Sequence, residues 1–324
     1  MQKVTKLDRV PTIEDIQLTH ETILPYIHRT PVFTNQSINE LTQAKLYFKC
    51  ENFQKIGAFK MRGATAAALA LSKEEVERGL ATHSSGNHAQ AVASIAKNLN
   101  TKAYIVMPSN APVIKKQATA GYGAEITLCE PTQEARETTL AAILARTGAT
   151  FIHPYDNYNV IAGQASAAKE LIEDSPILDA ILSPIGGGGL MSGTALATRY
   201  FSPTTKIYGT EPEAVNDAFR SFQSGKIEVN SSTNTIADGL KTNTCEKTFG
   251  IIQSHLQAIF TVSEEEIVSA MRLIWERMKI IIEPSCAVPF AAVLKHKELF
   301  INKKVGIILT GGNVDLTQLP FTKF

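Results

Sequence analysis

Polar side chains that could do chemistry gather in one short stretch, THSSGNHAQA at residues 82–91. Ser84, Ser85, Asn87 and His88 stand there directly before a run of helical character. Such residues are common helix caps and turn formers, so a purely structural helix start is one interpretation. One hydroxyl would be enough for a cap. The second leaves a binding or catalytic loop open as the other interpretation.

A lysine between apolar neighbours is the second candidate. In NFQKIGAFKMRGATAAALAL, residues 52–71, Lys60 stands between Phe59 and Met61 near the start of a helix of small residues. Desolvation favours the neutral, nucleophilic amine, so this lysine could form a Schiff base with a carbonyl group. The alternative is a surface lysine whose stem covers apolar neighbours.

Four consecutive glycines predict an anion site. In PIGGGGLMSGTALA, residues 184–197, the run Gly186, Gly187, Gly188 and Gly189 lies between an apolar strand and a helix. Free N–H groups and the helix dipole at such a helix start suit a phosphate. The run matches neither the Walker A motif nor GxGxxG, and a flexible connection is the alternative.

Two further groups follow apolar strands. GIILTGGNVD, residues 306–315, ends a strand at Thr310, where open α/β sheets collect ligands, although a plain glycine turn fits as well. GTEPEAVND, residues 209–217, places Glu211, Glu213 and Asp217 after another strand. Oxygen ligands at this spacing suit Mg²⁺ or Ca²⁺, and solvated acids at a helix start are the alternative.

Alternating strands and helices must position these residues. An amphipathic helix opens the chain, with Thr12 as its cap and Glu14 and Asp15 in its first turn. The alternation that follows predicts an α/β fold with parallel sheets covered by helices on both faces. The strand-like runs include 45–50, 102–107, 124–129, 149–154, 179–185, 206–211 and 304–310, and the helical runs between them include 87–98, 132–147 and 264–279.

The composition excludes several classes of protein. The 324 residues are 44% apolar and 19% charged, as in ordinary globular proteins, and the formal net charge of +1 gives no basic excess for binding nucleic acid. The sequence has no apolar run of signal-peptide or membrane-span length, so we expect a cytoplasmic protein without membrane contact. Four scattered cysteines favour reduced thiols over disulfides or a zinc site: Cys50, Cys129, Cys245 and Cys286.

Taken in order, GAFKMRGA, SSGNHAQA, GGGGL and TGGNVD resemble fold-type II pyridoxal-phosphate enzymes, and within them the serine racemase and serine/threonine dehydratase branch. The resemblance extends from Pro11 to Asp315. It implies two lobes, each with a parallel-rich sheet flanked by helices. Residues 1–72 and 158–324 would form a large lobe, 73–157 a small lobe, and pyridoxal 5′-phosphate would lie in the cleft between them. It also implies a homodimer.

The resemblance implies a role for each motif residue. Lys60 would carry the cofactor and act as a base on one face of the substrate, with Ser85 as the acid or base on the other. Thr310 would face the pyridine nitrogen and leave it largely unprotonated, which discourages transamination. The remaining cofactor contacts would be Phe59 beside the ring, Asn87 on the phenolic oxygen and Gly186, Gly187, Gly188 and Gly189 on the phosphate. The substrate carboxylate would be bound by Ser84, Asn87, His88 and Arg136, the last through a planar guanidinium.

The resemblance strengthens the cation site suggested by the carboxylates and implies a nucleotide site as well. Glu211, the carbonyl of Val215 and Asp217 would bind a divalent cation, expected to be Mg²⁺, with Ca²⁺ and Mn²⁺ as alternatives. Eukaryotic racemases also bind ATP between subunits. Part of that pattern is matched, whereas the loop FTNQSIN, residues 33–39, departs from its serine pair. The matching residues are Lys55, Gln90, Tyr122, Lys279 and Asn313.

The choice of reaction depends on the second serine. Racemisation needs an acid or base on each side of the α-carbon, whereas dehydration needs only one. Because Ser85 supplies the second group, we expect a serine racemase that also dehydrates serine, with threonine as a further substrate. A dedicated L-serine, L-threonine or 3-hydroxyaspartate dehydratase is the main alternative. A β-replacement synthase and a non-catalytic anion- or nucleotide-binding protein are the others.

Overall fold

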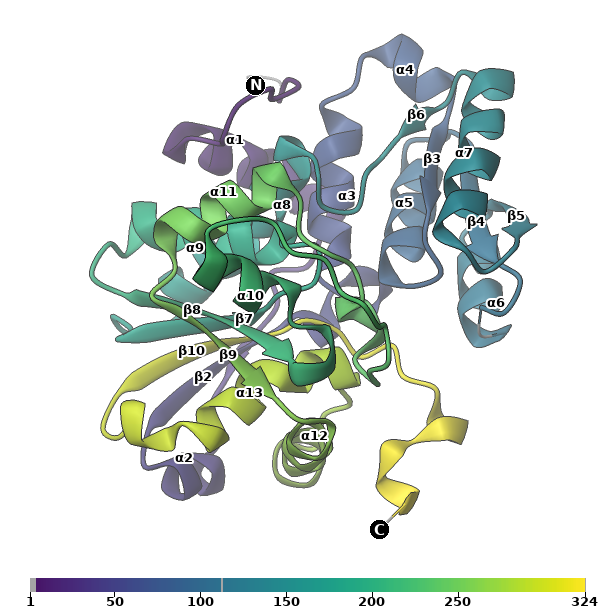
Figure 1. The fold of residues 1–324 in the computed structure, drawn as a ribbon. Helices are drawn as coiled ribbons and strands as arrows, with labels where there is room; N and C mark the ends of the chain where they lie inside the picture. The colour runs from purple at the N-terminus through teal and green to yellow at the C-terminus, as the bar shows by residue number, and fades with distance from the viewer. Residues whose placement is uncertain (1–3, 112, 324) are drawn as a thin grey trace.

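A computed structural model describes residues 4–111 and 113–323 of the chain. Its strands form two separate sheets with helices packed around them (Figure 1). The α/β architecture expected from the sequence is confirmed, and all strand pairs are parallel except one. No helix in the described part of the chain has the length and apolar character needed to cross a membrane.

The larger sheet has six strands and is covered by helices on both faces. Only its edge strand β1 is antiparallel, pairing with β2. Helix α13 packs against strands β7 to β10 on one face, and α8 and α9 pack on the other. The strand order is β1 (Val32–Phe33), β2 (Lys45–Cys50), β10 (Lys304–Leu309), β7 (Ala180–Pro184), β8 (Lys206–Pro212) and β9 (Ala258–Val262).

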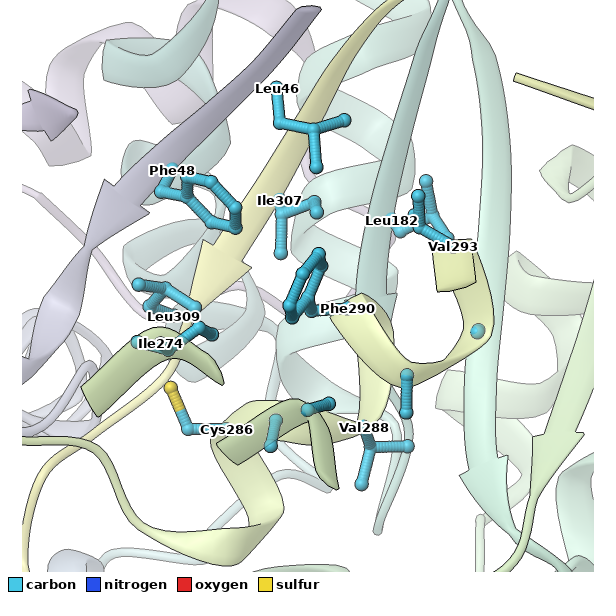
Figure 2. Close-up of a cluster of buried hydrophobic side chains, with 14 of the residues drawn as sticks. Leu46, Phe48, Leu182, Ile274, Cys286, Val288, Phe290, Val293, Ile307 and Leu309 are labelled. Atoms are coloured by element: carbon cyan, nitrogen blue, oxygen red, sulfur yellow. The ribbon is translucent and has the colours of Figure 1, made fainter. Parts of the chain in front are cut away.

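Alternation along β10 explains how this sheet buries both faces. Ile307 and Leu309 point into the cluster under α12 and α13, whereas Ile308 points into the cluster under α8 and α9. Figure 2 shows the first cluster, in which Phe290 of α13 lies among the strand side chains and meets Phe48 edge-on at 5.8 Å.

The smaller sheet has four parallel strands and its own helices. Figure 1 shows these elements together at one side of the molecule, joined to the rest through α3 and the segment after β6. The strand order is β5 (Glu125–Cys129), β4 (Ala103–Pro108), β3 (Leu80–His83) and β6 (Thr150–Phe151). The accompanying helices are α4 (Lys73–Glu77), α5 (Asn87–Asn98), α6 (Val113–Gly121) and α7 (Gln133–Thr147).

The remaining helices belong to the larger sheet or connect the two. They are α1 (Ile13–Ile23), α2 (Gln36–Thr42), α3 (Lys60–Leu69), α8 (Tyr158–Glu173), α9 (Gly189–Phe201), α10 (Asp217–Ser224), α11 (Glu246–His255), α12 (Glu264–Met278) and α13 (Pro284–Lys295). Thr12 caps α1 as predicted, in a capping box with Asp15.

Two strand expectations need correction. The run 149–154 forms a strand only over Thr150–Phe151, because the chain leaves the sheet before Pro154, which has no N–H for a ladder. The runs named from the sequence also did not include strands β1, β3 and β9.

Candidate active site

Lys60 is the first residue of α3, and its amine is held by the segment that follows β6. The Nζ atom donates a hydrogen bond to the carbonyl oxygen of Pro154 at 2.9 Å and lies 5.2 Å from the centre of the Phe59 ring. No acidic side chain forms an ion pair with it within the described ranges. Burial lowers the pKa of Lys60 to about 8, so a useful fraction of the amine is neutral and nucleophilic near neutral pH.

The glycine run joins β7 to α9 and keeps four N–H groups unbonded. No acceptor in the described part of the chain takes a hydrogen bond from the backbone N–H of Gly186, Gly187, Gly188 or Gly189, and all four residues are buried. Buried N–H groups without a partner are rare in proteins. At the start of α9 they form an anion site of the kind that phosphate occupies.

The segment after β6 brings the lysine and the glycine run together. Pro154 accepts from Lys60, and the next residue, Tyr155, packs its ring on Gly187. A Cβ atom added at Gly187 would lie 2.2 Å from Cδ1 of Tyr155, so only glycine fits there. Gly188 has φ +86°, which also favours glycine. The Lys60 amine and the glycine run with its unbonded N–H groups thus contact consecutive residues.

The end of β10 fixes the residues just before Lys60. Ala58 forms an antiparallel bridge with Gly311, and Phe59 donates its N–H to the Thr310 carbonyl at 3.0 Å. The Thr310 hydroxyl is buried without a well-formed hydrogen bond to any described residue, although the Cys286 thiol lies close to it. A buried hydroxyl of this kind is free to accept or donate to a ligand.

The loop with two serines lies between β3 and α5. Ser84 donates its N–H to Val106 at 3.1 Å, and its hydroxyl accepts from the Gly86 N–H at 3.3 Å. The Ser85 side chain makes no hydrogen bond within the described chain, and no acceptor takes the N–H of Asn87 or His88. The loop therefore offers a free hydroxyl and N–H groups at a helix start, which suit a carboxylate.

Asn87 links this loop to two residues near the end of the chain. Its Nδ2 donates to Glu283 at 2.8 Å, and its Oδ1 accepts from Asn313 Nδ2 at 2.9 Å. The second Nδ2 hydrogen has no acceptor assigned and can donate to a ligand. Burial, with a smaller contribution from Asp238, raises the pKa of Glu283 to about 8. Glu283, like Tyr155, was missed at the sequence level because no motif surrounds it.

The two remaining substrate candidates differ in what they can offer. His88 Nε2 lies 2.8 Å from the Ile152 carbonyl and must donate to it, which leaves Nδ1 as a buried, unpartnered acceptor. Burial, assisted by the charge of Lys60, lowers the pKa of His88 to about 3, so neutral His88 accepts a hydrogen bond rather than donating to a carboxylate. Arg136 on α7 forms no ion pair with any described residue, and its Nε is buried and unpartnered.

The cation candidates form a pair of buried carboxylates. Glu211 accepts from the N–H groups of Ala218 and Phe219, and Asp217 accepts from Asn230 and Thr244. Burial raises the pKa of both acids, and the charge of Asp217 raises that of Glu211 further. The described residues contain no group of three or more His, Cys, Asp or Glu side chains that could hold a metal. Glu213 is not part of the pair, since it bonds Lys295.

The nucleotide candidates are only partly brought together. Asn313 bonds the Ile56 carbonyl at 2.8 Å, beside Lys55 in the same turn, and α5, which carries Gln90, packs on that turn. Tyr122 packs into the apolar cluster that includes α5 residues, and Lys279 follows the end of α12 with φ +59°. No hydrogen bond joins the five residues into one site within the described chain.

The chain is similar to enzymes of known families over almost its whole length. Residues 23–311 match the family described as pyridoxal-phosphate dependent enzyme. The sequence is 48% identical over 312 residues to β-hydroxyaspartate dehydratase of Paracoccus denitrificans, covering 96% of this chain and 99% of the relative. It is 49% identical over 312 residues to serine racemase of Dictyostelium discoideum, covering 95% and 96%. The structure of maize serine racemase matches with a TM-score of 0.93 and 41% identity, covering 95% of each chain.

Proposed function

Because the chain belongs to the family of pyridoxal-phosphate-dependent enzymes, we propose that it is a serine racemase that also dehydrates serine to a 2-oxoacid and ammonia. The observation that carries this proposal is the joining of Lys60 and the unbonded glycine run through Pro154 and Tyr155. We propose threonine as a further substrate. We also propose a cytoplasmic homodimer.

The cofactor fits the residues that are present. The four unbonded N–H groups of the glycine run would hold the phosphate, and Lys60 would hold the cofactor through its amine. Asn87 would donate to the phenolic oxygen, Phe59 would pack beside the ring, and the free Thr310 hydroxyl would meet the pyridine nitrogen. Pyridoxal phosphate supplies an electron sink for the charge left when the α-proton is removed. We place the cofactor between a large lobe of residues 1–72 and 158–324 and a small lobe of residues 73–157. Residues 1–3, 112 and 324 of that division lie outside the described residues.

The chain's own groups account for binding and proton transfer. The N–H groups at the start of α5, the Ser84 hydroxyl and the unpaired guanidinium of Arg136 would hold the substrate carboxylate. His88, as a neutral acceptor, would orient a hydroxyl or ammonium group of the substrate or a neighbouring side chain. Lys60 would move the proton on one face of the α-carbon, and the free hydroxyl of Ser85 would move it on the other.

Dehydration uses the same groups but needs proton transfer on only one face of the α-carbon, so Ser85 is not required for it. A serine substrate carries a β-hydroxyl, so loss of that group competes with return of the proton to the opposite face. The ratio of the two products depends on how readily Ser85 delivers its proton. Some pyruvate is therefore expected beside D-serine.

A divalent cation at Glu211 and Asp217 is a further proposal. Two buried, mutually repelling carboxylates are what a cation would neutralise, and the Val215 carbonyl would complete the set. Mg²⁺ is the first choice, with Ca²⁺ and Mn²⁺ as alternatives. ATP as an activator at Lys55, Gln90, Tyr122, Lys279 and Asn313 stays a prediction, to be checked by adding ATP to the assay.

The first experiment incubates cofactor-loaded protein with L-serine and Mg²⁺ and follows D-serine and pyruvate together. We expect both products. Ser85→Ala should abolish D-serine formation while pyruvate formation from at least one enantiomer remains. The adjacent Ser84→Ala is the matched control, because loss of a carboxylate contact should weaken both reactions alike. Equal loss of every activity in a Ser85→Ala protein that still binds cofactor would contradict the two-face mechanism.

The second candidate function is dehydration of 3-hydroxyaspartate without racemisation. It is supported by the 48% identity to a protein named β-hydroxyaspartate dehydratase, and the unpaired Arg136 could bind an additional carboxylate. Pyruvate alone from L-serine, together with faster turnover of 3-hydroxyaspartate, would favour it. A non-catalytic anion-binding protein is excluded if borohydride traps a pyridoxyl group on Lys60.

A further inference from the structure

A cluster of buried charged residues lies behind the helix that carries Lys60. Arg62 is fully buried and forms hydrogen bonds with two carboxylates. Its Nε and Nη2 donate to Glu51 at 2.7 and 2.8 Å, and its Nη1 and Nη2 donate to Glu170 at 2.8 and 2.7 Å. Lys49 and His20 also contact Glu170, at 2.6 and 2.8 Å. We call this set the Arg62 cluster: His20, Lys49, Glu51, Arg62 and Glu170.

The Arg62 cluster is balanced and fully bonded. Arg62 and Lys49 face the carboxylates of Glu51 and Glu170, and Lys49 also lies 3.9 Å from Asp174. Thr30 donates its hydroxyl to Glu51 and its carbonyl accepts from Lys49, while Ser166 accepts from Arg62 at 3.0 Å. Burial alone would raise the pKa of Glu170, but hydrogen bonds from His20 and Arg62 outweigh it and lower that pKa. Buried ion pairs pay a large desolvation cost and add little net stability, so what this cluster provides is a fixed geometry.

The start of α3 has no side-chain cap of its own, so the bonds that hold it come from elsewhere in the fold. The end of β10 binds Ala58 and Phe59, and Gln164 accepts from the Gly63 N–H at 3.2 Å. Phe59 at the N-cap makes no side-chain capping bond, and the first turn contains no acidic residue. Ile56 and Gly57, which precede Ala58 and Phe59, have left-handed φ values of 60° and 72°. A helix start without caps leaves orphan N–H groups and tends to fray. The first turn of α3 is therefore fixed by tertiary contacts.

Arg62 and Lys60 leave this turn in opposite directions. Two residues along an α-helix are separated by about 200° around its axis. Lys60 reaches Pro154, whereas Arg62 reaches inward to Glu51, which follows β2, and to Glu170 on α8. A shift of the first turn cannot occur without breaking bonds of the Arg62 fork.

We propose that Arg62 is a positioning residue: its fork to Glu51 and Glu170 locks the first turn of α3 and thereby fixes the Lys60 amine for reaction with the cofactor. This inference rests on the proposed function, because it assumes that Lys60 is the residue that reacts. It assigns to Arg62 no contact with substrate or cofactor.

The test compares two variants of the same cluster. Arg62→Lys keeps the charge but loses the planar fork, so one of the two carboxylates is released. His20→Ala removes a different contact of Glu170, from α1, and leaves the Arg62–Glu51 pair intact. Both should lower the melting temperature. Only Arg62→Lys should change the behaviour of Lys60.

The readout is the reaction of the apoprotein with pyridoxal phosphate, trapped with borohydride at a series of pH values and located by peptide mass spectrometry. The titratable groups that interact electrostatically with Lys60 are His88 on α5 and His153 after β6. Burial lowers the pKa of both. A displaced Lys60 gains water, so Arg62→Lys should move the trapping midpoint upward by about one pH unit. The rate at which Lys60 reacts with pyridoxal phosphate should fall about 100-fold, as expected for a misplacement of the reacting amine near 1 Å. His20→Ala should match wild type in both.

The outcomes separate this inference from the proposed function. If wild-type Lys60 is not trapped, the proposed function fails and the inference fails with it. If wild-type Lys60 is trapped but Arg62→Lys behaves like His20→Ala, only the positioning role is wrong. Should Arg62→Lys not fold, Glu51→Gln weakens the same fork from the other side and takes its place. If neither folds while His20→Ala does, the cluster determines the fold as a whole and the positioning role is overturned.

Discussion

Gly187→Ala is expected to damage the phosphate cradle through one neighbour, Tyr155. The added Cβ would lie 2.2 Å from Cδ1 and 2.4 Å from both Cγ and Cε1 of the tyrosine ring. Ordinary carbon contacts begin near 3.4 Å, so the ring or the loop must move by about 1 Å or more. The ring cannot yield freely, because it packs edge-on against His153 at 4.7 Å. The loop will therefore be displaced.

The expected magnitude has two parts. Overpacking of a well-packed site costs about 1–3 kcal/mol of folding stability. Displacement of the loop also removes at least one N–H bond to the phosphate, worth about 1.5–3 kcal/mol for a charged acceptor, which corresponds to a loss of roughly 10- to 100-fold in cofactor affinity. Combining Gly187→Ala with Tyr155→Ala removes the obstacle, so the two effects should be non-additive by at least about 1 kcal/mol.

The assay titrates each apoprotein with pyridoxal phosphate, followed by visible absorbance, and measures urea unfolding in parallel. Gly250→Ala is the matched control, because Gly250 is exposed on α11 with no atom within 4 Å of an added Cβ. It should leave affinity unchanged and stabilise the helix by roughly 0.5–1 kcal/mol. Wild-type affinity in Gly187→Ala, or strict additivity with Tyr155→Ala, would refute this account of the cradle.

Three further changes test separate parts of the molecule. Arg136→Gln should raise the KM for the amino acid about 10-fold or more while leaving the melting temperature unchanged, since no described residue pairs with that guanidinium; steady-state kinetics and a thermal melt check both. The pKa of Glu283 is about 8 in the folded chain, against an ordinary 4.5. The free energy of unfolding of wild type therefore falls as pH rises from about 4.5 to about 8. Glu283→Gln should remove that loss and be more stable than wild type by an amount on the order of 3 kcal/mol at pH 8 but not at pH 4 in urea unfolding of the apoprotein. Phe290→Ala in the core of Figure 2 should cost about 3–5 kcal/mol, against less than about 0.5 kcal/mol for the exposed Ile177→Ala.

Local patterns were sufficient for most elements of the fold. The run 45–50 and the helix 87–98 have the bounds expected from the sequence, and Thr12 caps α1. These elements are determined by features that lie within a few residues: apolar alternation, small residues in a helical run and a capping hydroxyl. The run 149–154 ends as a strand at Phe151, before Pro154, which has no N–H for the sheet and whose carbonyl instead accepts from Lys60.

The candidate site was predictable only in part, and the division has a physical cause. Lys60 and the glycine run stand out because both reduce folding stability unless they serve a function. A lysine among apolar residues loses hydration, and glycines lose more conformational entropy than other residues on folding. The residues that fix them are ordinary in sequence. Pro154 is 94 positions from Lys60, Glu170 is 108 from Arg62 and Glu283 is 196 from Asn87.

Such partners become visible only when the sheets have brought them together, because a hydrogen bond depends on distance and direction and not on separation along the chain. Residues that contact a ligand can therefore be predicted from the sequence, whereas the residues that position them become evident only in the folded structure. If the Arg62 cluster positions Lys60, the pH at which Lys60 reacts is determined partly by Glu51 and Glu170, neither of which contacts its amine. A catalytic motif copied without that buried support would keep the lysine but lose control of its reactivity.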